Sequence, residues 1–161
     1  MKTDFPTHER GSTNGTISFD LDGTLADLNF EKAVWLTEIP RLFAKKNNLD
    51  FETAKKAVFS AYEYVGDRDA KWYDIKFWFS ELGLEGDYNS LLEGSSHLIK
   101  LYPDTVPALE RLGKGYDLVV ISNATRDFID FKLKVDDLEK YFSRVFSTTS
   151  DFNCIKGDSK G

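Results

Sequence analysis

The fold of this chain is decided by the stretch ISFDLDGTL, residues 17–25. Its apolar start belongs to a predicted strand over residues 16–21, and the Asp22-Gly23 pair is typical of a tight turn. The strand therefore delivers Asp20 and Asp22 to one end of a sheet. Asp is also a common turn-capping residue, but the context of the whole stretch is far more restrictive and indicates a site built on two carboxylates.

The region after this turn is predicted to be helical, because apolar residues recur at helical spacing between about 27 and 100. Four helices are expected, near residues 30–46, 51–65, 70–82 and 88–100. Asp50 and Asp69 occupy N-cap positions, and Gly83 stands where a helix C-terminus is followed by glycine. Pro40 should kink or divide the first helix. The region is expected to form a small helical domain.

Strands and helices alternate after Pro103. The expected elements are a helix over 104–112, a strand over 117–122, helices over 125–133 and 137–142, and a strand over 144–147. This alternation predicts parallel βαβ units in an α/β fold, whose ligands bind beyond the carboxyl ends of the strands. Asp20 and Ser122 both fall at such ends.

The composition limits the class of protein. A chain of 161 residues with 41% hydrophobic residues buries one core, or one core with a small satellite domain. Its net charge of −6 disfavours non-specific nucleic-acid binding, so a small solute is the expected partner. Cys154 is the single cysteine, and no apolar run approaches the roughly 20 residues that span a bilayer. With a polar leader over residues 1–14 that lacks a signal-peptide core, we expect a cytoplasmic protein without membrane partners.

The pair Asp20 and Asp22 resembles the first motif of the haloacid dehalogenase superfamily. In that family the first Asp attacks phosphorus to form an aspartyl-phosphate, and the second protonates the leaving oxygen and later activates water. The resemblance implies that Asp20 is the nucleophile and Asp22 the general acid/base. A carboxylate attacks an anionic phosphoryl group only where a cation offsets their repulsion, and the resemblance implies that this cation is Mg²⁺ on Asp20 and the Asp22 main-chain carbonyl. Dehalogenases of the family lack the second acid, so Asp22 favours phosphoryl transfer.

Two further segments are similar to motifs of this family. Ser122 and Asn123 follow a buried strand, and the resemblance implies that they bind the phosphoryl group, although Ser-Asn is also ordinary turn chemistry. Lys156 looks like the lysine that offsets charge on the nucleophile; the alternative is a solvated surface lysine. Asn153 and Gly157 depart from the family, which often has Gly and Pro there, and Asn tolerates positive φ.

The fourth motif of the family places further metal-binding acids at the end of a fourth strand, and the chain ends before such a strand. Residues 157–159 superficially resemble its start but lack the preceding strand. The expectation is a truncated enzyme whose missing acids would complete the Mg²⁺ site. In the family's strand order, this truncation would leave the strand over 16–21 as a bare edge.

The predicted fold is a Rossmann-like three-layer α/β core with an inserted helical C1 cap. Its parts are a flexible leader over 1–14, a core over 15–26 and 101–161, and a cap over 27–100. The predicted function is Mg²⁺-dependent hydrolysis of a small phosphate monoester through an aspartyl-phosphate at Asp20. The alternatives are a phosphomutase, or a catalytically weak relative with a binding or regulatory role. The partner is expected to be a small phosphorylated metabolite, and the oligomeric state is left open.

Other candidate residues have simpler explanations. His8 and His97 lack further His or Cys residues that would complete a metal site, and Cys154 is expected to be a small apolar residue. An aromatic group in the helical region could line a substrate pocket, but its helical spacing favours a core role. This group consists of Trp72, Tyr73, Phe77 and Trp78.

Overall fold

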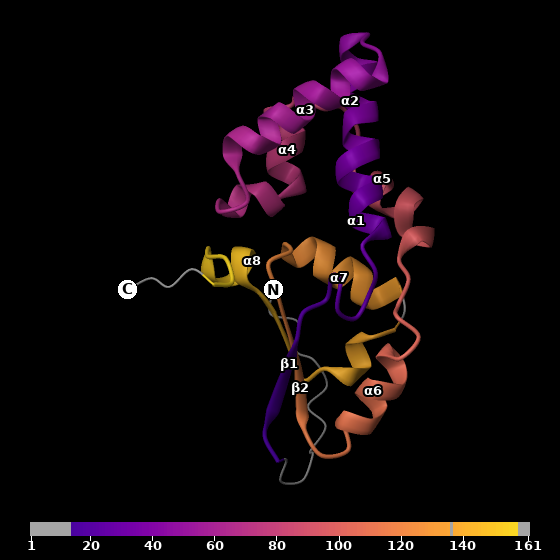
Figure 1. Cartoon of the computed structure of the whole chain (residues 1–161), viewed down its shortest axis with the longest axis vertical. Coiled ribbons are helices and arrows are strands. Elements are labelled where there is room, and N and C mark those ends of the chain that lie inside the picture. The colour runs from indigo at the N-terminus through magenta and orange to yellow at the C-terminus, as the bar shows by residue number, and fades with distance from the viewer. Residues whose placement is uncertain (1–13, 136, 158–161) are drawn as a thin grey trace.

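The computed structural model describes residues 14–135 and 137–157. Figure 1 shows a helical cap standing above a parallel sheet with its own helices. Most of the predicted leader, His8 and the Asp158-Ser159 pair lie outside the described residues. Within the described ranges, no helix is both long and apolar enough to cross a membrane.

The sheet has three parallel strands in the order β1-β2-β3. They span Thr16–Phe19 (β1), Asp117–Ser122 (β2) and Arg144–Ser147 (β3). β2 and β3 have the predicted bounds, and β1 lies at an edge as expected. The prediction that β1 reaches Leu21 is wrong, because the Leu21 carbonyl turns back to accept hydrogen bonds from the amides of Leu25 and Ala26 at 2.9 and 3.0 Å. Asp20 therefore stands directly beyond the strand.

The helices of the sheet domain confirm the predicted βαβ pattern. They are α6 (Thr105–Leu112), α7 (Arg126–Val135), the 3₁₀ turn η4 (Glu139–Tyr141) and α8 (Thr148–Phe152). Figure 1 shows α6 and α7 on the same face of the sheet. The connections from β1 to β2 and from β2 to β3 both step across the sheet in the same direction. Right-handed crossovers of this kind place their helices on the same face of the sheet. The expected helix over 137–142 is shorter than predicted, and α8 was not predicted.

The regular elements of the cap between Asn29 and Leu98 are all helical and are joined by short loops. Its elements are α1 (Asn29–Ala33), η1 (Val34–Glu38), α2 (Ile39–Asn47), α3 (Phe51–Val65), η2 (Ala70–Tyr73), α4 (Ile75–Glu81), α5 (Tyr88–Ser95) and η3 (Ser96–Leu98). The parallel sheet with this helical cap confirms the predicted fold class. The division into core and cap at residues 27 and 100 stays a prediction.

Several local predictions for the cap can be compared with the structure. Asp50 caps α3 by accepting a hydrogen bond from the Thr53 amide at 3.0 Å, as its position predicted. Pro40 lies in the first turn of α2, and the π-helical segment η1 immediately before it divides the long first helix. A single helix over 70–82 is wrong, because the Asp74 side chain accepts from the Lys76 amide at 2.9 Å and starts a new helix, α4. The helix over 88–100 is also shorter than predicted, since α5 ends at Ser95.

The helix α7 connects two hydrophobic clusters. The cap cluster surrounds the fully buried Trp78 and includes Phe128 of α7. The sheet cluster lies between the strands and their helices, and Ile129 and Leu133 of α7 belong to it. Because one helix contributes to both clusters, the cap is packed directly on the sheet domain through α7.

Candidate active site

Asp20 and Asp22 lie in the turn that follows β1. The Asp20 Oδ1 atom accepts a hydrogen bond from the Leu21 amide at 2.8 Å. Gly23 has a φ of +73°, and its amide donates to the Ala26 carbonyl at 2.8 Å. A left-handed glycine at this point lets the chain reverse within a few residues. The reversal leaves both carboxylates at the carboxyl end of the sheet.

Ser122 and Asn123 end the neighbouring strand. Ser122 is buried, and its Oγ accepts a hydrogen bond from the Ala124 amide at 3.1 Å. The Asn123 Oδ1 atom accepts from the Thr148 hydroxyl and from the Lys156 amide, both at 2.8 Å. The amide oxygen of Asn123 therefore holds the loop that carries Lys156, and its NH₂ group is the part suited to an anionic ligand.

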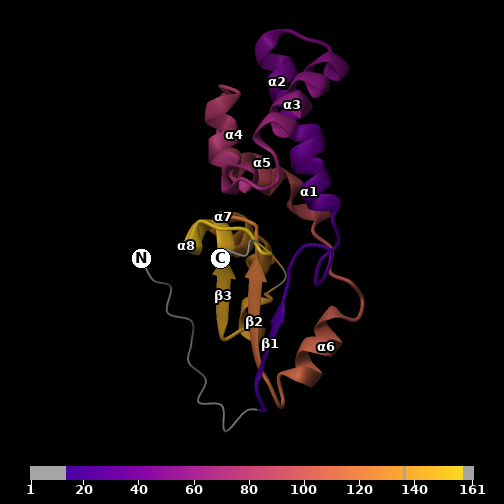
Figure 2. The same ribbon diagram turned by 60° about the vertical axis from the view of Figure 1, so that its left-hand side comes forward.

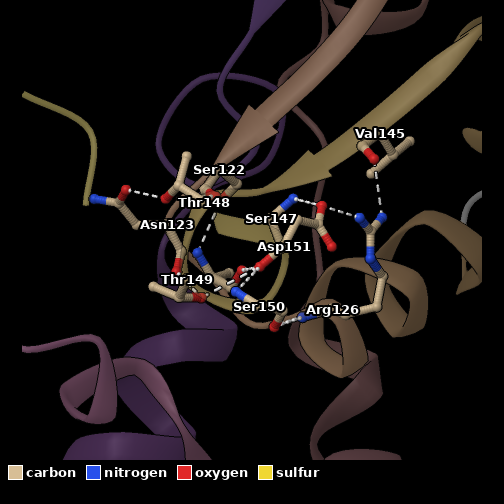
Figure 3. A network of polar contacts seen from close by, with 10 residues as sticks. Ser122, Asn123, Arg126, Val145, Ser147, Thr148, Thr149, Ser150 and Asp151 are labelled. Atoms are coloured by element: carbon tan, nitrogen blue, oxygen red, sulfur yellow. Dashed lines mark hydrogen bonds and ion pairs between the residues drawn. The ribbon is translucent and has the colours of Figure 1, made fainter. Parts of the chain in front are cut away.

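A network of hydroxyl groups fastens α8 to the end of β2 (Figure 3). The buried Ser147 hydroxyl donates to the Ala124 carbonyl at 2.7 Å and accepts from the Ser150 amide at 3.0 Å. Thr149 donates to the Asn123 carbonyl at 3.0 Å. Two segments far apart in the sequence are thus locked together, and they orient the loop that follows α8.

Lys156 is held at its side chain as well as at its backbone. Its Nζ atom lies 2.6 Å from Asp20 Oδ2 and donates to the Ile121 carbonyl at 3.1 Å. Asn153, which ends α8, has a φ of +49°, a conformation that Asn accepts more readily than most residues. These contacts place the lysine against the predicted nucleophile, although Lys156 is exposed, and its role at the site stays a prediction.

The structure adds a charged residue that sequence reasoning missed. Lys132 of α7 is 2% exposed, and its ammonium group forms ion pairs with the carboxylates of Asp22 and Glu31. Burial lowers the pKa of Lys132, and the neighbouring Asp22 carboxylate opposes this shift. One signal was available in the sequence: Lys132 shares the apolar face of its helix with Phe128, Ile129 and Leu133, where a charge needs a buried partner.

A cavity of about 300 Å³ lies where the cap meets this edge of the sheet. Its polar wall is formed by Asp20, Asp22, Glu31, Ser122 and Asn123. Its apolar wall is formed by Leu28, Trp35, Trp72, Tyr73, Ala124 and Phe128. A volume of this size suits a small ligand, and the two walls would receive a polar and an apolar part of the same molecule.

The expectation that the four cap aromatics are all core residues needs correction. Trp78 is fully buried and donates to the Trp72 carbonyl at 2.9 Å, and Phe77 packs against the cap cluster. Trp72 also packs against the cap cluster, but both Trp72 and Tyr73 line the cavity. The interruption of the helix at Asp74 separates these two residues from α4, so a single helical face does not describe all four.

The remaining candidates do not join this site. His97 is exposed, and its Nδ1 atom lies 3.1 Å from the Gly94 carbonyl oxygen, within the cap. Cys154 is half-buried on the loop between α8 and Lys156. Among residues 14–135 and 137–157, no group of three or more His, Cys, Asp or Glu side chains gathers as a metal site.

Comparison with known proteins identifies the family. Residues 15–160 match the family model of the haloacid dehalogenase-like hydrolases. The chain belongs to this hydrolase family. A curated relative, the GMP/IMP nucleotidase YrfG of Escherichia coli, is 28% identical over 134 residues, which cover 83% of this chain and 59% of the relative. The same figures hold for the nucleotidase of this name from Shigella flexneri.

Solved structures agree with this assignment. A HAD phosphatase from Thermococcus onnurineus has a TM-score of 0.77 and 29% identity, covering 89% of this chain and 66% of that one. A Clostridium difficile protein has a similar fold, with a TM-score of 0.53 and 21% identity. The match covers 89% of this chain and 64% of that one. The chain therefore spans about three fifths of the length of the curated relatives it matches.

Proposed function

We propose that this chain hydrolyses a small phosphate monoester at the cavity below the cap, with Asp20 as the nucleophile. The observation that carries the proposal is the Lys156 ammonium group 2.6 Å from Asp20 Oδ2, in a site that also contains Asp22 and Ser122. A fixed cation beside a carboxylate offsets the charge that gathers when an anionic phosphoryl group approaches. Family membership and the relatives named as a phosphatase and nucleotidases support the same reaction class.

The reaction would take place in two steps. A carboxylate oxygen of Asp20 forms a bond to phosphorus, and the bond from phosphorus to the ester oxygen breaks, while Asp22 gives its proton to that oxygen. A water molecule then attacks the phosphorus, Asp22 takes up its proton, and inorganic phosphate leaves Asp20. Ser122 and the Asn123 NH₂ group would donate hydrogen bonds to the phosphoryl oxygens in both steps.

The residues present fit part of a magnesium site. Carboxylate and carbonyl oxygens are the ligands that Mg²⁺ prefers, and it is commonly bound through one or two carboxylates together with water and substrate phosphate. The Asp20 carboxylate and the main-chain carbonyl of Asp22 would hold it. When bound, the ion would neutralise charge on the phosphoryl group.

The substrate class that suits the cavity is a nucleoside monophosphate. Trp35, Trp72 and Tyr73 line the cavity together with its carboxylates. Aromatic side chains bind planar ring systems by stacking and edge contacts. The Escherichia coli relative is named as a nucleotidase for GMP and IMP, which supports the same substrate class here.

The test is magnesium-dependent release of phosphate from nucleoside monophosphates and simpler phosphate esters. Asp20→Asn should abolish turnover, because an amide is not a nucleophile toward phosphorus. Asp104→Asn is the matched control, since Asp104 is exposed at the start of α6 and its side chain makes no capping hydrogen bond. Turnover that survives in Asp20→Asn would show that the nucleophile is wrong.

Phosphate release separates hydrolysis from the two alternatives, neither of which releases phosphate. A phosphomutase would isomerise a phosphorylated substrate without releasing phosphate. A binding or regulatory relative would bind a phosphate ester without turning it over.

Trp72→Leu tests the substrate class separately. The native chain should prefer guanosine monophosphate to ribose 5-phosphate, and the variant should lose that preference. An unchanged preference would exclude a stacking role for Trp72.

A further inference from the structure

The buried Lys132 is the least expected group at the site. It is 2% exposed, although lysine is rarely buried without partners. Its ammonium group contacts the Asp22 and Glu31 carboxylates and lies 5.2 Å from the centre of the Phe30 ring. A buried charge is retained only where charged or polar partners replace water, so these contacts determine where the ammonium group sits.

The two carboxylates come from different parts of the fold. Asp22 belongs to the turn after β1, whereas Glu31 belongs to α1, the first helix of the cap. Lys132 itself is on α7, the helix that packs against both hydrophobic clusters. Three segments of the chain therefore meet at one ammonium group.

We infer that Lys132 is a positioning residue for Asp22, the general acid/base of the proposed reaction. The ammonium group holds Asp22 Oδ1 on the side of α7, which leaves Oδ2 as the oxygen that exchanges the proton with substrate and water. The inference rests on the proposed function, because it assigns Lys132 a role through Asp22. It adds a residue that no motif of the chain indicates.

Glu31 holds Lys132 in place from the other side. Both Glu31 carboxylate oxygens are buried, and one of them, Oε1, forms an ion pair with the Lys132 ammonium. Without Glu31, Lys132 would still contact Asp22. Without Lys132, the Asp22 and Glu31 carboxylates would lose the cation that they share, and the orientation of Asp22 would be lost.

The decisive variant is the double substitution Glu31→Gln with Lys132→Met. It removes one positive and one negative charge, so it avoids the unpaired buried charge that could prevent Lys132→Met alone from folding. Glu31→Gln by itself is the matched control, because it loses the same cap carboxylate and keeps the contact between Lys132 and Asp22. Thermal unfolding of both variants checks that they are folded.

The kinetic comparison uses p-nitrophenyl phosphate and phenyl phosphate, which differ little in shape but strongly in how much the leaving oxygen needs a proton. For phenyl phosphate, kcat/KM of the double variant should fall about 100-fold, as expected when a general acid is misplaced. For p-nitrophenyl phosphate it should fall far less. Glu31→Gln changes the cavity wall for both substrates alike, so its ratio of the two kcat/KM values should stay at the native value.

A second comparison separates positioning from general damage. In an Asp22→Asn background, adding the double substitution should cause no further loss, because the group it positions is already absent. Equal losses on both substrates, or losses that add to those of Asp22→Asn, would overturn the inference.

A readout without turnover keeps the inference testable if the proposed function fails. Crystal structures of the native chain and the double variant should differ in the orientation of the Asp22 carboxylate. An unchanged Asp22 would overturn the positioning role. Absence of turnover that depends on Asp20 would instead reject the proposed function, and the structural comparison would still stand.

Discussion

The cap and the carboxyl edge of the sheet are held together by different kinds of interaction. The cap is built around aromatic contacts, for example the Tyr62 and Trp78 rings, whose centres are 4.6 Å apart at an interplanar angle of 73°. The edge of the sheet is built from hydroxyls, amides and ion pairs, such as Ser147 on Ala124 and Lys156 on Asp20. Figure 2 shows the two regions stacked, with α7 between them.

This difference indicates how each region serves the site. The free energy gained by burying aromatic side chains is roughly proportional to the apolar area removed from water and depends little on direction. It therefore stabilises the cap without determining the position of single atoms. Hydrogen bonds and ion pairs depend on distance and angle. The polar edge can therefore place reacting groups accurately, while the cap supplies an apolar cover.

The largest expected effect on stability comes from a substitution in the aromatic cap cluster. Trp78→Ala should lower the free energy of unfolding by about 3–5 kcal/mol, because it opens a cavity in the cap cluster. Urea denaturation followed by circular dichroism measures the change. Tyr64→Ala is the control, since Tyr64 is 91% exposed and its loss should change stability by less than about 0.5 kcal/mol. Equal effects of the two substitutions would contradict the assigned role of the cap cluster.

A smaller loss of stability is expected from a substitution at the polar carboxyl edge of the sheet. Ser147→Ala removes the hydroxyl that joins α8 to the end of β2 and should cost about 1–3 kcal/mol, because buried partners lose their hydrogen bonds. Since α8 precedes the Lys156 loop, phosphate release should fall as well. Ser60→Ala, at an exposed position of α3, is the control. A loss of stability without any loss of turnover would show that this hydroxyl network stabilises the fold but does not position the site.

An effect confined to alkaline pH is expected at Tyr62. Burial raises its pKa above the ordinary value of 10.0, and its hydroxyl donates to the Trp35 carbonyl at 3.2 Å. The folded state then keeps a proton that the unfolded state releases, so stability is complete below the unfolded pKa and falls as the pH rises above it. Denaturation at about pH 8 and about pH 11 should show this fall in the native chain and a weaker one in Tyr62→Phe. Tyr64→Phe, at an exposed position, should behave like the native chain.

The smallest effect is expected at the exposed ion pair between cap and sheet domain. Lys76 Nζ lies 2.6 Å from Asp127 Oδ2, and this carboxylate raises the pKa of Lys76. Both side chains are substantially exposed, so Lys76→Ala should change stability by no more than about 1 kcal/mol. The difference from the native chain should shrink in high salt, because exposed charges are screened. A difference that high salt leaves unchanged would indicate a role in packing instead.

Regular elements with a clear hydrophobic period could be predicted from the sequence. The helix over 51–65 and the strands over 117–122 and 144–147 have the predicted bounds. The helix over 70–82 failed because Asp74 bonds to the backbone locally and starts a new helix, a choice that apolar spacing does not report. The short α8 was missed although its N-cap bond, from the Ser150 amide to the Ser147 hydroxyl, is local, because the side-chain bonds that hold it reach carbonyls after β2.

The candidate site was predictable to a similar degree. The structure brings the predicted Asp20, Asp22, Ser122 and Asn123 to one cavity and places Lys156 on Asp20. Their catalytic roles stay predictions. Lys132 was not foreseen, and a pocket role for Trp72 and Tyr73 was considered but a core role preferred, because a residue on a helix does not reveal which distant segment it meets.

The sequence by itself determined the parallel sheet, the inserted helical region and the strand ends at which Asp20 and Ser122 lie, because these follow from hydrophobic period and turn residues over short stretches. Only the tertiary structure decided which charges meet. Lys132 joins Asp22 and Glu31 across separations of at least 100 residues along the chain, and no motif indicated these pairs; the pair of Lys156 and Asp20 was expected only from the family resemblance. Such pairs form because packing brings the strand ends, α1 and α7 together, and a buried charge is stable only beside a partner of opposite sign.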